Sequence, residues 1–497
     1  MTMSPREEEL YRERLAKLNR LRDRGIDPYP TRFNRTHTSS AAIAAFEASE
    51  AAMTDAPGVT IAGRLTALRR MGKAVFLDLQ DGEGRIQVFA RADNLSPTDF
   101  ETIKDDVDLG DILGASGPMI RTRAGEVSVQ AESITVLAKS LQTPPEKWHG
   151  LQDTEQRYRQ RYRDLMANEE VRGIFRTRAA IIRTMRRYLD DRGFMEVETP
   201  VLQPEAGGAA ATPFVTHHRA LDEDFFLRIS LELHLKRLLV GGFERVYEIG
   251  RIFRNEGVSW KYNPEFTMLE CYEAYADYHD VARMVEDMVS GIATTVLGST
   301  TVRFEEHEID LTPPWRRVTM RDALLEHAGI DFQEFNTREA LYAELRRRGF
   351  ADLDPGWSWG KLIDEAVSHY VEPKLIQPTF LLDYPKALSP LAKSKPGEDG
   401  IVERFEVFIA GFEIGNAYSE LNDPVDQRQR FEEQRRLAAA GIEEVETLDE
   451  DFLAALEHGM PPTGGLGIGI DRLTMILTGN HSIREVILFP ALRRKQD

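Results

Sequence analysis

The sequence has only one cysteine, Cys271, among its 497 residues, so it cannot form an internal disulfide framework. It also has no apolar run close to the ~18 residues that a membrane span needs, and its first residues form no apolar signal region. Cys271 itself lies in an alternating apolar run, which favours a buried strand residue over a catalytic thiol. These absences favour a protein of the reducing cytoplasm that has no membrane partner.

Positive charge is scarce relative to negative charge, because 63 Lys and Arg residues against 82 Asp and Glu residues give a net charge of −19. This balance argues against a nucleic-acid binder that is basic overall, since phosphate contacts need Lys and Arg. The local balance differs, because seven basic and five acidic residues lie between Arg6 and Arg24. A solvated charged helix and a local RNA-binding surface both explain this stretch.

The chain is too long for one hydrophobic core and divides into regions of different periodicity. We predict an N-terminal helical extension over 1–56, a small β-domain over 57–142 and a linker over 143–160. A larger domain of mixed strands and helices follows over 161–497, with a helical insertion at about 313–350. No internal repeat and no low-complexity tract interrupts this organisation.

The β-domain shows short alternating runs separated by turn signals. The runs are 59–65, 74–79, 85–90, 112–117 and 127–131. A tight turn at 81–84 joins the second and third runs. Five strands in so short a segment, with a helical stretch after the third, predict a five-stranded Greek-key β-barrel of the OB type.

Barrels of this type often bind single-stranded nucleic acid on one sheet face. On that face Phe76 would stack on a base, while Arg64 and Gln87 would contact its edge or a phosphate. Phe76 could equally lie in the barrel core, and the sequence leaves both positions open.

A long hairpin is predicted around residues 253–270. Arg254 directly follows an apolar run, a polar loop containing Gly257 comes next, and a second alternating run covers 266–270. Charged residues at both ends of this hairpin suit a site that holds a polyphosphate between the backbone and an arginine.

A glycine-rich run at 464–469 precedes Asp471 and Arg472 near the other end of the chain. Its spacing fits neither a phosphate-binding P-loop nor a dinucleotide fingerprint. By itself the run favours a strand whose glycines allow close backbone approach. Followed by Arg472, the same glycines would also admit a flat ligand and form a nucleotide pocket.

Two carboxylates, Glu406 and Glu413, lie seven residues apart across an apolar run, and oxygen ligands of this kind suit Mg²⁺ that bridges phosphates. If the next segment is extended, Asn416, Tyr418 and Glu420 share one face of a strand. A polar row of this kind is costly to bury unless a ligand satisfies it, and the alternative is a solvated strand face.

Several segments together resemble the class II aminoacyl-tRNA synthetases, specifically the bacterial lysyl-tRNA synthetases. The matching segments are 193–200 (motif 1), 253–270 (motif 2) and 465–472 (motif 3), with 207–214, 231–236 and 413–422 between them. The resemblance covers nearly the whole chain. It implies an α+β protein in which an OB-fold anticodon-binding domain precedes an antiparallel-sheet catalytic domain flanked by helices. It also implies a homodimer that associates through the motif 1 region.

The resemblance assigns roles to individual residues. Arg254 would bind the α-phosphate of ATP and the lysine carboxylate, and Arg472 would bind the γ-phosphate; these are the catalytic residues. The remaining ATP contacts would be Glu256, Asn263, Phe266 and Glu413, and Glu406 with Glu413 would hold Mg²⁺. The lysine-binding residues would be Gly208, Glu232, Glu270, Tyr272, Asn416, Tyr418 and Glu420. Arg64, Phe76 and Gln87 would read the tRNA anticodon.

The implied activity is that of an ATP-dependent lysine–tRNA ligase, which activates L-lysine to lysyl-adenylate and transfers it to the 3′-end of tRNA(Lys). Two rival activities are a ligase that lysylates a protein and a non-catalytic RNA-binding paralogue. The predicted barrel weighs against the first, and the presence of Arg254, Glu413 and Arg472 weighs against the second. The chain departs from the family at Lys261–Tyr262, where Arg-His is common, and at Tyr418, where Phe is frequent.

Overall fold

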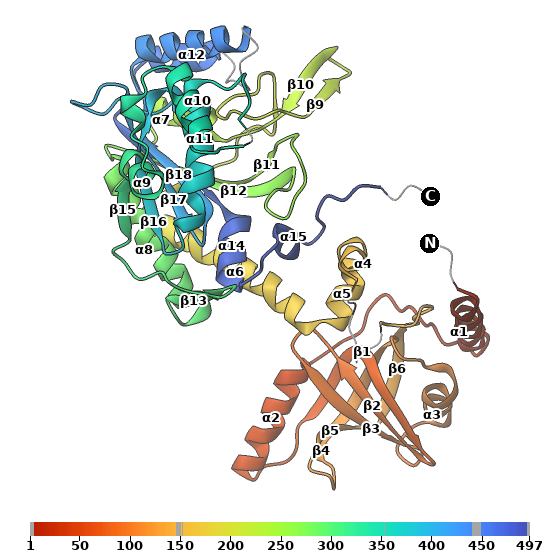
Figure 1. The fold of residues 1–497 in the computed structure, drawn as a ribbon. Helices are drawn as coiled ribbons and strands as arrows, with labels where there is room; N and C mark the ends of the chain where they lie inside the picture. Colours follow the sequence, from red (N-terminus) through yellow and green to blue (C-terminus); the bar gives the residue numbers. More distant parts are fainter. Residues whose placement is uncertain (1–3, 146–150, 152, 352, 440–448, 495–497) are drawn as a thin grey trace. The chain divides into compact units, whose positions relative to one another are not determined.

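The computed structural model describes residues 4–145, 151, 153–351, 353–439 and 449–494, and the chain divides into two compact units, 1–152 and 153–497 (Figure 1). Each unit has its own hydrophobic core. Within the described ranges, no helix is long and apolar enough to cross a membrane.

The first unit is a β-sheet with short helices around it. Its strands are β1 (Gly58–Met71), β2 (Ala74–Gln80), β3 (Arg85–Arg91), β4 (Ile112–Arg121), β5 (Val127–Ala131) and β6 (Ser133–Ala138), and its α-helices are α1 (Pro5–Asp23), α2 (Ser39–Ala52) and α3 (Pro97–Glu101). The strand pairing runs β1–β2–β3–β5–β4 and returns from β4 to β1, the circuit expected of an OB-type barrel. The sixth strand, β6, which the sequence analysis did not predict, pairs with β4.

Alternation along β2 determines which side chains enter the core of this unit. Val75, Leu77 and Leu79 are buried in the core cluster, whereas Phe76 and Asp78 point to the opposite face. Phe76 is half-buried on that face. Of the two positions that the sequence left open for Phe76, this excludes the barrel core.

Helix α1 uses its basic residues within its own unit. Arg14 is buried and donates to the backbone carbonyls of Leu109, Ser140 and Gln142 at 3.1, 3.0 and 3.2 Å. Lys17 forms an ion pair with Asp108, and both Arg20 and Arg24 form ion pairs with Asp106. These contacts favour an intramolecular role for much of the basic stretch over a free RNA-binding surface.

The second unit is built on an eight-stranded mixed sheet of order β15–β16–β17–β18–β19–β12–β11–β7. Its strands are β7 (Met195–Glu196), β11 (Arg245–Phe253), β12 (Glu265–Ala274), β15 (Arg316–Thr319), β16 (Thr379–Pro385), β17 (Ile401–Ile409), β18 (Phe412–Ser419) and β19 (Thr463–Gly469). The pairs at the two edges are parallel and all inner pairs are antiparallel, which agrees with the expected α+β fold. Smaller sheets are formed by β8 (Leu202–Gln203), β9 (Val215–His218) and β10 (Glu223–Leu227), and by β13 (Thr301–Phe304) and β14 (His307–Asp310).

Helices cover this sheet on both faces. They are α4 (Thr154–Arg159), α5 (Arg161–Ala167), α6 (Glu169–Asp190), α7 (Glu232–Val240), α8 (Tyr278–Leu297), α9 (Met320–Ala328), α10 (Arg338–Arg347), α11 (Trp359–Tyr370), α12 (Pro424–Ala439), α13 (Glu450–Glu457), α14 (Ile470–Thr478) and α15 (Ile483–Val486). Side chains of α6, α8 and α14 form the largest core on one face. On the other face α7 and α13 pack near β11 and β12, while α9 to α11 pack on β16 and β17.

The hairpin predicted at 253–270 is present, because β11 and β12 pair antiparallel from Arg245↔Glu273 to Phe253↔Glu265. Residues 313–350 hold β15 before the helices α9 and α10, so this segment is helical only in part. Its description as an insertion stays a prediction, as do the other domain boundaries.

Candidate functional site

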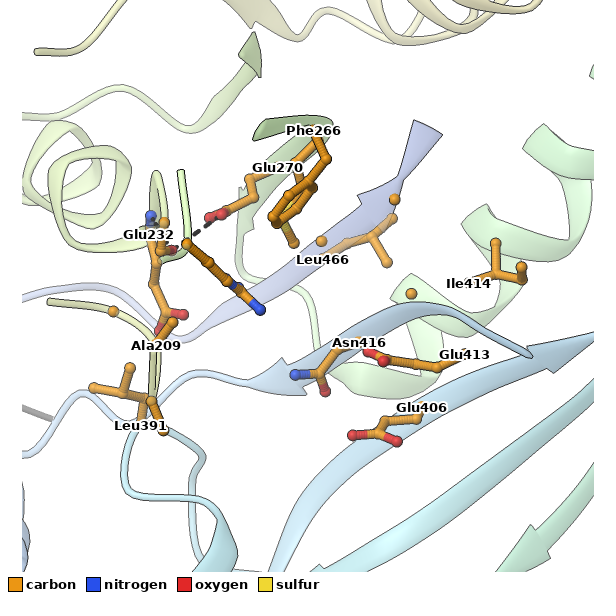
Figure 2. A pocket seen from close by; sticks show the side chains of 18 of the residues that line it. Ala209, Glu232, Phe266, Glu270, Leu391, Glu406, Glu413, Ile414, Asn416 and Leu466 are labelled. Carbon is orange, nitrogen blue, oxygen red and sulfur yellow. Dashed lines mark hydrogen bonds between the residues drawn. The ribbon is translucent and has the colours of Figure 1, made fainter. Parts of the chain in front are cut away.

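A cavity of about 410 Å³ opens on the sheet face opposite α6, α8 and α14. It is lined from strands β12, β17, β18 and β19, from the loops that lead into α7 and β12, from the segment 387–392 and from the first turn of α14 (Figure 2). Thirteen of the predicted residues line it: Gly208, Glu232, Arg254, Glu256, Asn263, Phe266, Glu270, Tyr272, Glu406, Glu413, Asn416, Tyr418 and Arg472. Glu420 does not line the cavity but lies buried directly behind its wall.

Glu270 is a buried carboxylate held by donors from three directions. Its Oε1 accepts from Ser230 Oγ and from the backbone N–H of Leu231, both at 3.0 Å, and its Oε2 accepts from Tyr272 Oη at 3.0 Å. Burial, together with the charge of Glu232, raises the pKa of Glu270 from its ordinary 4.5 to about 7. A bound cation would reverse this penalty, so this wall of the cavity is suited to a cationic group.

Glu232 and Glu420 share one internal cation, Lys236. The Lys236 ammonium is fully buried and contacts Oε1 of Glu232 and Oε2 of Glu420. The second oxygen of Glu232 accepts from Tyr418 Oη at 3.3 Å. Among the described residues, Oε1 of Glu420 has no hydrogen-bond partner.

The glycines of β19 make room for protein side chains. A Cβ at Gly465 would lie 1.8 Å from Glu420 Oε1 and 2.6 Å from the ring of Tyr272, and one at Gly467 would lie 2.7 Å from Met268 Cε. The close-approach interpretation of the glycine run therefore holds at these two positions.

Arg254 begins the loop between β11 and β12 and faces Phe266. Its guanidinium lies 5.3 Å from the centroid of the Phe266 ring, and its Nε donates to the carbonyl of Ile229 at 3.4 Å. Arg254 lines the cavity, in which a carboxylate or phosphate would satisfy its other donors.

Arg472 lies on the first turn of α14. Asp471 fixes this turn, because its Oδ2 accepts from the backbone N–H of Thr267 at 2.7 Å and its Oδ1 forms an ion pair with Arg178 at 2.7 Å. Arg472 Nη1 contacts Glu413 Oε2 at 3.0 Å. Burial lowers the pKa of Arg472, but the charge and hydrogen bond of Glu413, together with the neighbouring Tyr262 and Glu372, raise the pKa overall.

Arg404, on β17, binds two other residues of the cavity wall. It donates to Glu406 Oε1 at 2.7 Å and to Asn416 Oδ1 at 3.0 Å. Burial and the charge of Glu413 raise the pKa of Glu406 to about 7. In Figure 2 Glu406 and Glu413 lie on one side of the cavity, and Glu232 and Glu270 lie on the other.

The donor set at Glu406 and Glu413 fits a hard divalent cation. Both groups are carboxylates on a cavity wall, each contacts an arginine through one oxygen, and the charge of Glu413 contributes to the raised pKa of Glu406. Within the described ranges, no group of three or more His, Cys, Asp or Glu side chains could hold a metal ion by itself. A cation here would therefore need further oxygens from a phosphate ligand and water.

Other predicted contacts are partly engaged within the protein. Asn263 Oδ1 accepts from the backbone N–H of Ala491 at 3.1 Å, whereas Glu256 is exposed on the loop. The ring of Tyr262 lies 5.4 Å from the guanidinium of Arg472, so this departure from the family places an aromatic ring beside Arg472.

The outer face of the first unit carries an aromatic pair. Phe76 stacks on Phe89 with ring centroids 4.7 Å apart. Gln87 accepts from Ser128 Oγ at 2.9 Å, on the same face. Arg64 donates to the carbonyl of Gly110 at 2.8 Å, and burial lowers its pKa.

Sequence reasoning missed Lys236, Arg404 and Phe89. A signal existed for Lys236, since Glu232 and Lys236 are four residues apart on a helix and such pairs meet. Arg404 and Glu406 are two residues apart on one strand, which places them on one face. Phe89 pairs with Phe76 across two predicted strands, and only the register brings the rings together.

Comparisons with known proteins agree with this geometry. The family described as tRNA synthetases class II (D, K and N) matches residues 153–493, and an OB-fold nucleic acid binding domain matches residues 59–137. The chain is 57% identical over 493 residues to a lysine–tRNA ligase of Dehalococcoides mccartyi, covering 99% of each protein. It is 56% identical over 490 residues to a lysine–tRNA ligase of Roseiflexus castenholzii, covering 98% of this chain and 99% of the relative. A lysine–tRNA ligase of Moorella thermoacetica is 54% identical over 494 residues, with 99% of each chain covered.

Proposed function

The chain belongs to the class II tRNA synthetases of the D, K and N group, and from that premise we propose that it is an ATP-dependent lysine–tRNA ligase. It activates L-lysine to lysyl-adenylate and transfers the lysyl group to the 3′-end of tRNA(Lys). The observation that carries the proposal is the group of buried carboxylates, Glu232, Glu270 and Glu420, at one end of a cavity whose other end holds Arg254 and Arg472.

The carboxylates support lysine as the amino acid. Glu232 and Gly208 would bind the α-ammonium, and Glu270, Tyr272 and Glu420 would surround the ε-ammonium. A neutral amino acid of similar length would leave these carboxylates buried and unpaired, which costs several orders of magnitude in kcat/KM by the logic of unsatisfied polar sites. Asn416 would contact the lysine carboxylate, and the Tyr418 ring would pack on the aliphatic stem.

The arginines support a nucleotide beside the lysine. Arg254 would bind both the α-phosphate and the lysine carboxylate, so that the carboxylate attacks the α-phosphorus in line and pyrophosphate leaves. Arg472 would hold the γ-phosphate, Phe266 would stack on adenine, and Glu256 and Asn263 would contact the nucleotide. No protein base is needed, because the attacking carboxylate is already an anion.

Glu406 and Glu413 would hold Mg²⁺ together with phosphate oxygens. A bound Mg²⁺ would neutralise charge on the phosphates during adenylate formation. Arg404 supports this arrangement, because it orients Glu406 and Asn416 with the same guanidinium.

The first unit would bind the tRNA anticodon through the outer face of its sheet. The stacked pair of Phe76 and Phe89 offers a ring edge and face to a base, and Gln87 lies on the same face. Arg64 would contribute a donor to a base or phosphate, although one of its nitrogens already binds the Gly110 carbonyl.

A homodimer formed through the motif 1 region is part of the proposal. The edge strand β7 and the segment after it expose Met195, Val201 and Leu202, which are 39%, 40% and 46% accessible. Such exposed apolar side chains beside a sheet edge are typical of an interface. A molar mass of about twice 56.5 kDa in sedimentation equilibrium would support the dimer. A cytoplasmic location also stays a prediction.

The test is an ATP–pyrophosphate exchange assay with a panel of amino acids, followed by charging of tRNA(Lys). We expect exchange with lysine and little exchange with ornithine, arginine, methionine or norleucine. Exchange that depends on a different amino acid would overturn the assignment. Lysine-dependent exchange without tRNA charging would instead favour transfer of lysine to another acceptor.

A further inference from the structure

The amino-acid end of the cavity contains a cation of the protein itself. Lys236 is fully buried, and its ammonium contacts both Glu232 and Glu420. The rings of Tyr418 and Phe452 each lie 5.9 Å from the same ammonium. Lys236 does not line the cavity, so it is not in the path of a ligand.

The geometry gives this ammonium one oxygen from each carboxylate. Lys236 takes Oε1 of Glu232 and Oε2 of Glu420. The opposite oxygen of Glu232 faces Tyr418, and the opposite oxygen of Glu420 lies beside Gly465 on the cavity wall. Lys236 thereby engages one oxygen of each carboxylate and leaves the other outside its contact. Among the described residues, this second oxygen of Glu420 is buried and has no hydrogen-bond partner.

The charges on the protein and on lysine then balance. Three buried carboxylates, Glu232, Glu270 and Glu420, against one ammonium leave two formal negative charges. A lysine molecule brings two ammonium groups, and its carboxylate has Arg254 as a separate partner. Without Lys236 the occupied pocket would keep one uncompensated buried anion, which is strongly destabilising.

The groups that face Lys236 account for its charge state. Burial lowers its pKa, but the charges of Glu232 and Glu420 outweigh burial and raise it. From α13 the facing group is the ring of Phe452, and Arg237 next along α7 pairs with Asp449 instead. Lys236 therefore keeps its charge. Burial raises the pKa of Glu420 well above its ordinary value, and the charge of Lys236 is the largest contribution that opposes this rise.

We propose that Lys236 is a charge-balancing, positioning residue for amino-acid selection, which supplies one positive charge to Glu232 and Glu420 and orients both side chains, so that two ammonium groups of the substrate complete the pocket. This inference rests on the proposed lysine specificity. It adds a residue that does not touch the substrate but sets the number of charges that the substrate must bring.

The experiment counts protons released when lysine binds. Wild-type protein is first shown to catalyse lysine-dependent exchange; failure at this step would concern the proposed function and not Lys236. Lysine is then titrated calorimetrically at pH 7.5 in phosphate and in Tris, whose different ionisation enthalpies report the protons released per lysine bound.

In Lys236→Met one carboxyl group has lost its counter-charge and takes up a proton. Lysine binding must expel that proton, so the variant should release about one proton more than wild type. Its KM for lysine should rise by at least roughly tenfold, because a buried pair is broken. If binding is too weak for calorimetry, the steeper fall of log KM with rising pH gives the same count.

Two further variants separate charge balance from packing. Lys236→Met with Glu420→Gln removes one positive and one negative charge and should return the proton count to the wild-type value. Lys395→Met removes a lysine that also bridges two acids, Asp383 and Glu398, at 2.8 and 2.6 Å, and should leave the count unchanged. A wild-type proton count in Lys236→Met would overturn the proposal. So would a double variant that binds lysine but releases as many protons as Lys236→Met, since the extra proton would then not depend on the balance of charge.

Discussion

Glu270 predicts that lysine affinity depends on pH in the physiological range. Its pKa is raised from 4.5 to about 7, mainly by burial and secondarily by Glu232. This net shift means that the empty site disfavours the charged form of Glu270 by about 3 kcal/mol. The ε-ammonium of lysine pairs with the ionised carboxylate, so binding at low pH must first remove a proton.

The sign and size of the effect follow from the ionised fraction. Below pH 7 most Glu270 is protonated, and above pH 7 most of it is ionised. The apparent KM for lysine should therefore fall as pH rises, by about tenfold between pH 6 and pH 8, with the midpoint near 7. Lysine itself keeps both ammonium groups over this range.

The assay is ATP–pyrophosphate exchange at saturating Mg²⁺ and ATP. Saturation is needed because the pKa of Glu406 is also raised to about 7, so Mg²⁺ binding could otherwise change over the same pH range. Glu270→Gln cannot titrate, so its KM should be higher than that of wild type but constant with pH. A wild-type KM that does not change between pH 6 and 8 would refute the reasoning that Glu270 receives the ammonium. An equal slope in wild type and Glu270→Gln would assign the titration to another group.

Three further predictions concern the strand, the metal carboxylates and the first unit. Gly465→Ala should abolish lysine-dependent exchange, because the added Cβ would lie 1.8 Å from Glu420 Oε1, while the near-ultraviolet circular dichroism spectrum stays native. The control Gly291→Ala should retain activity, because a Cβ there meets nothing within 4 Å. Glu413→Gln should raise the Mg²⁺ concentration for half-maximal exchange several-fold, and an unchanged Mg²⁺ dependence would remove Glu413 from the metal site. Phe76→Ala should lower kcat/KM for tRNA charging by roughly ten- to a hundredfold and leave exchange intact, as expected for one lost base stack; loss of both activities would indicate a structural role.

Periodicity predicted the elements that carry one exposed and one buried face. The alternation in β2 and β3 is readable because every second side chain of these strands enters the hydrophobic core. The hairpin of β11 and β12 is readable from the polar loop that separates its two apolar runs. The strand β6 escaped prediction because it pairs only with the edge of β4 and its alternation is short. Likewise β15 covers only four residues before α9, too few for a period to stand out.

Residues of the candidate site were predictable from the sequence where a recognisable motif contains the charged side chain. Arg254, Glu413 and Arg472 are recognisable by motif position, and the cavity brings all three to one face of the sheet. The partner of a buried charge is harder to predict, because it is set by tertiary approach. Lys236 and Glu420 are far apart in the chain. Nothing in their spacing indicates that the Lys236 ammonium contacts the Glu420 carboxylate.

The glycine run on β19 shows how one pattern can serve two purposes that the sequence cannot separate. At Gly465 and Gly467 the missing side chains leave room for Glu420, Tyr272 and Met268. These two glycines therefore permit close packing of side chains around the proposed lysine-binding end of the cavity. At Gly469 the nearest atom to an added Cβ is the Ile414 carbonyl at 3.8 Å, and this glycine lines the cavity directly before the helix that carries Arg472. Space at Gly469 is therefore open to a ligand, whereas space at Gly465 is already filled by the protein. It follows that alanine at Gly465 should damage lysine recognition, while alanine at Gly469 should affect ATP binding first.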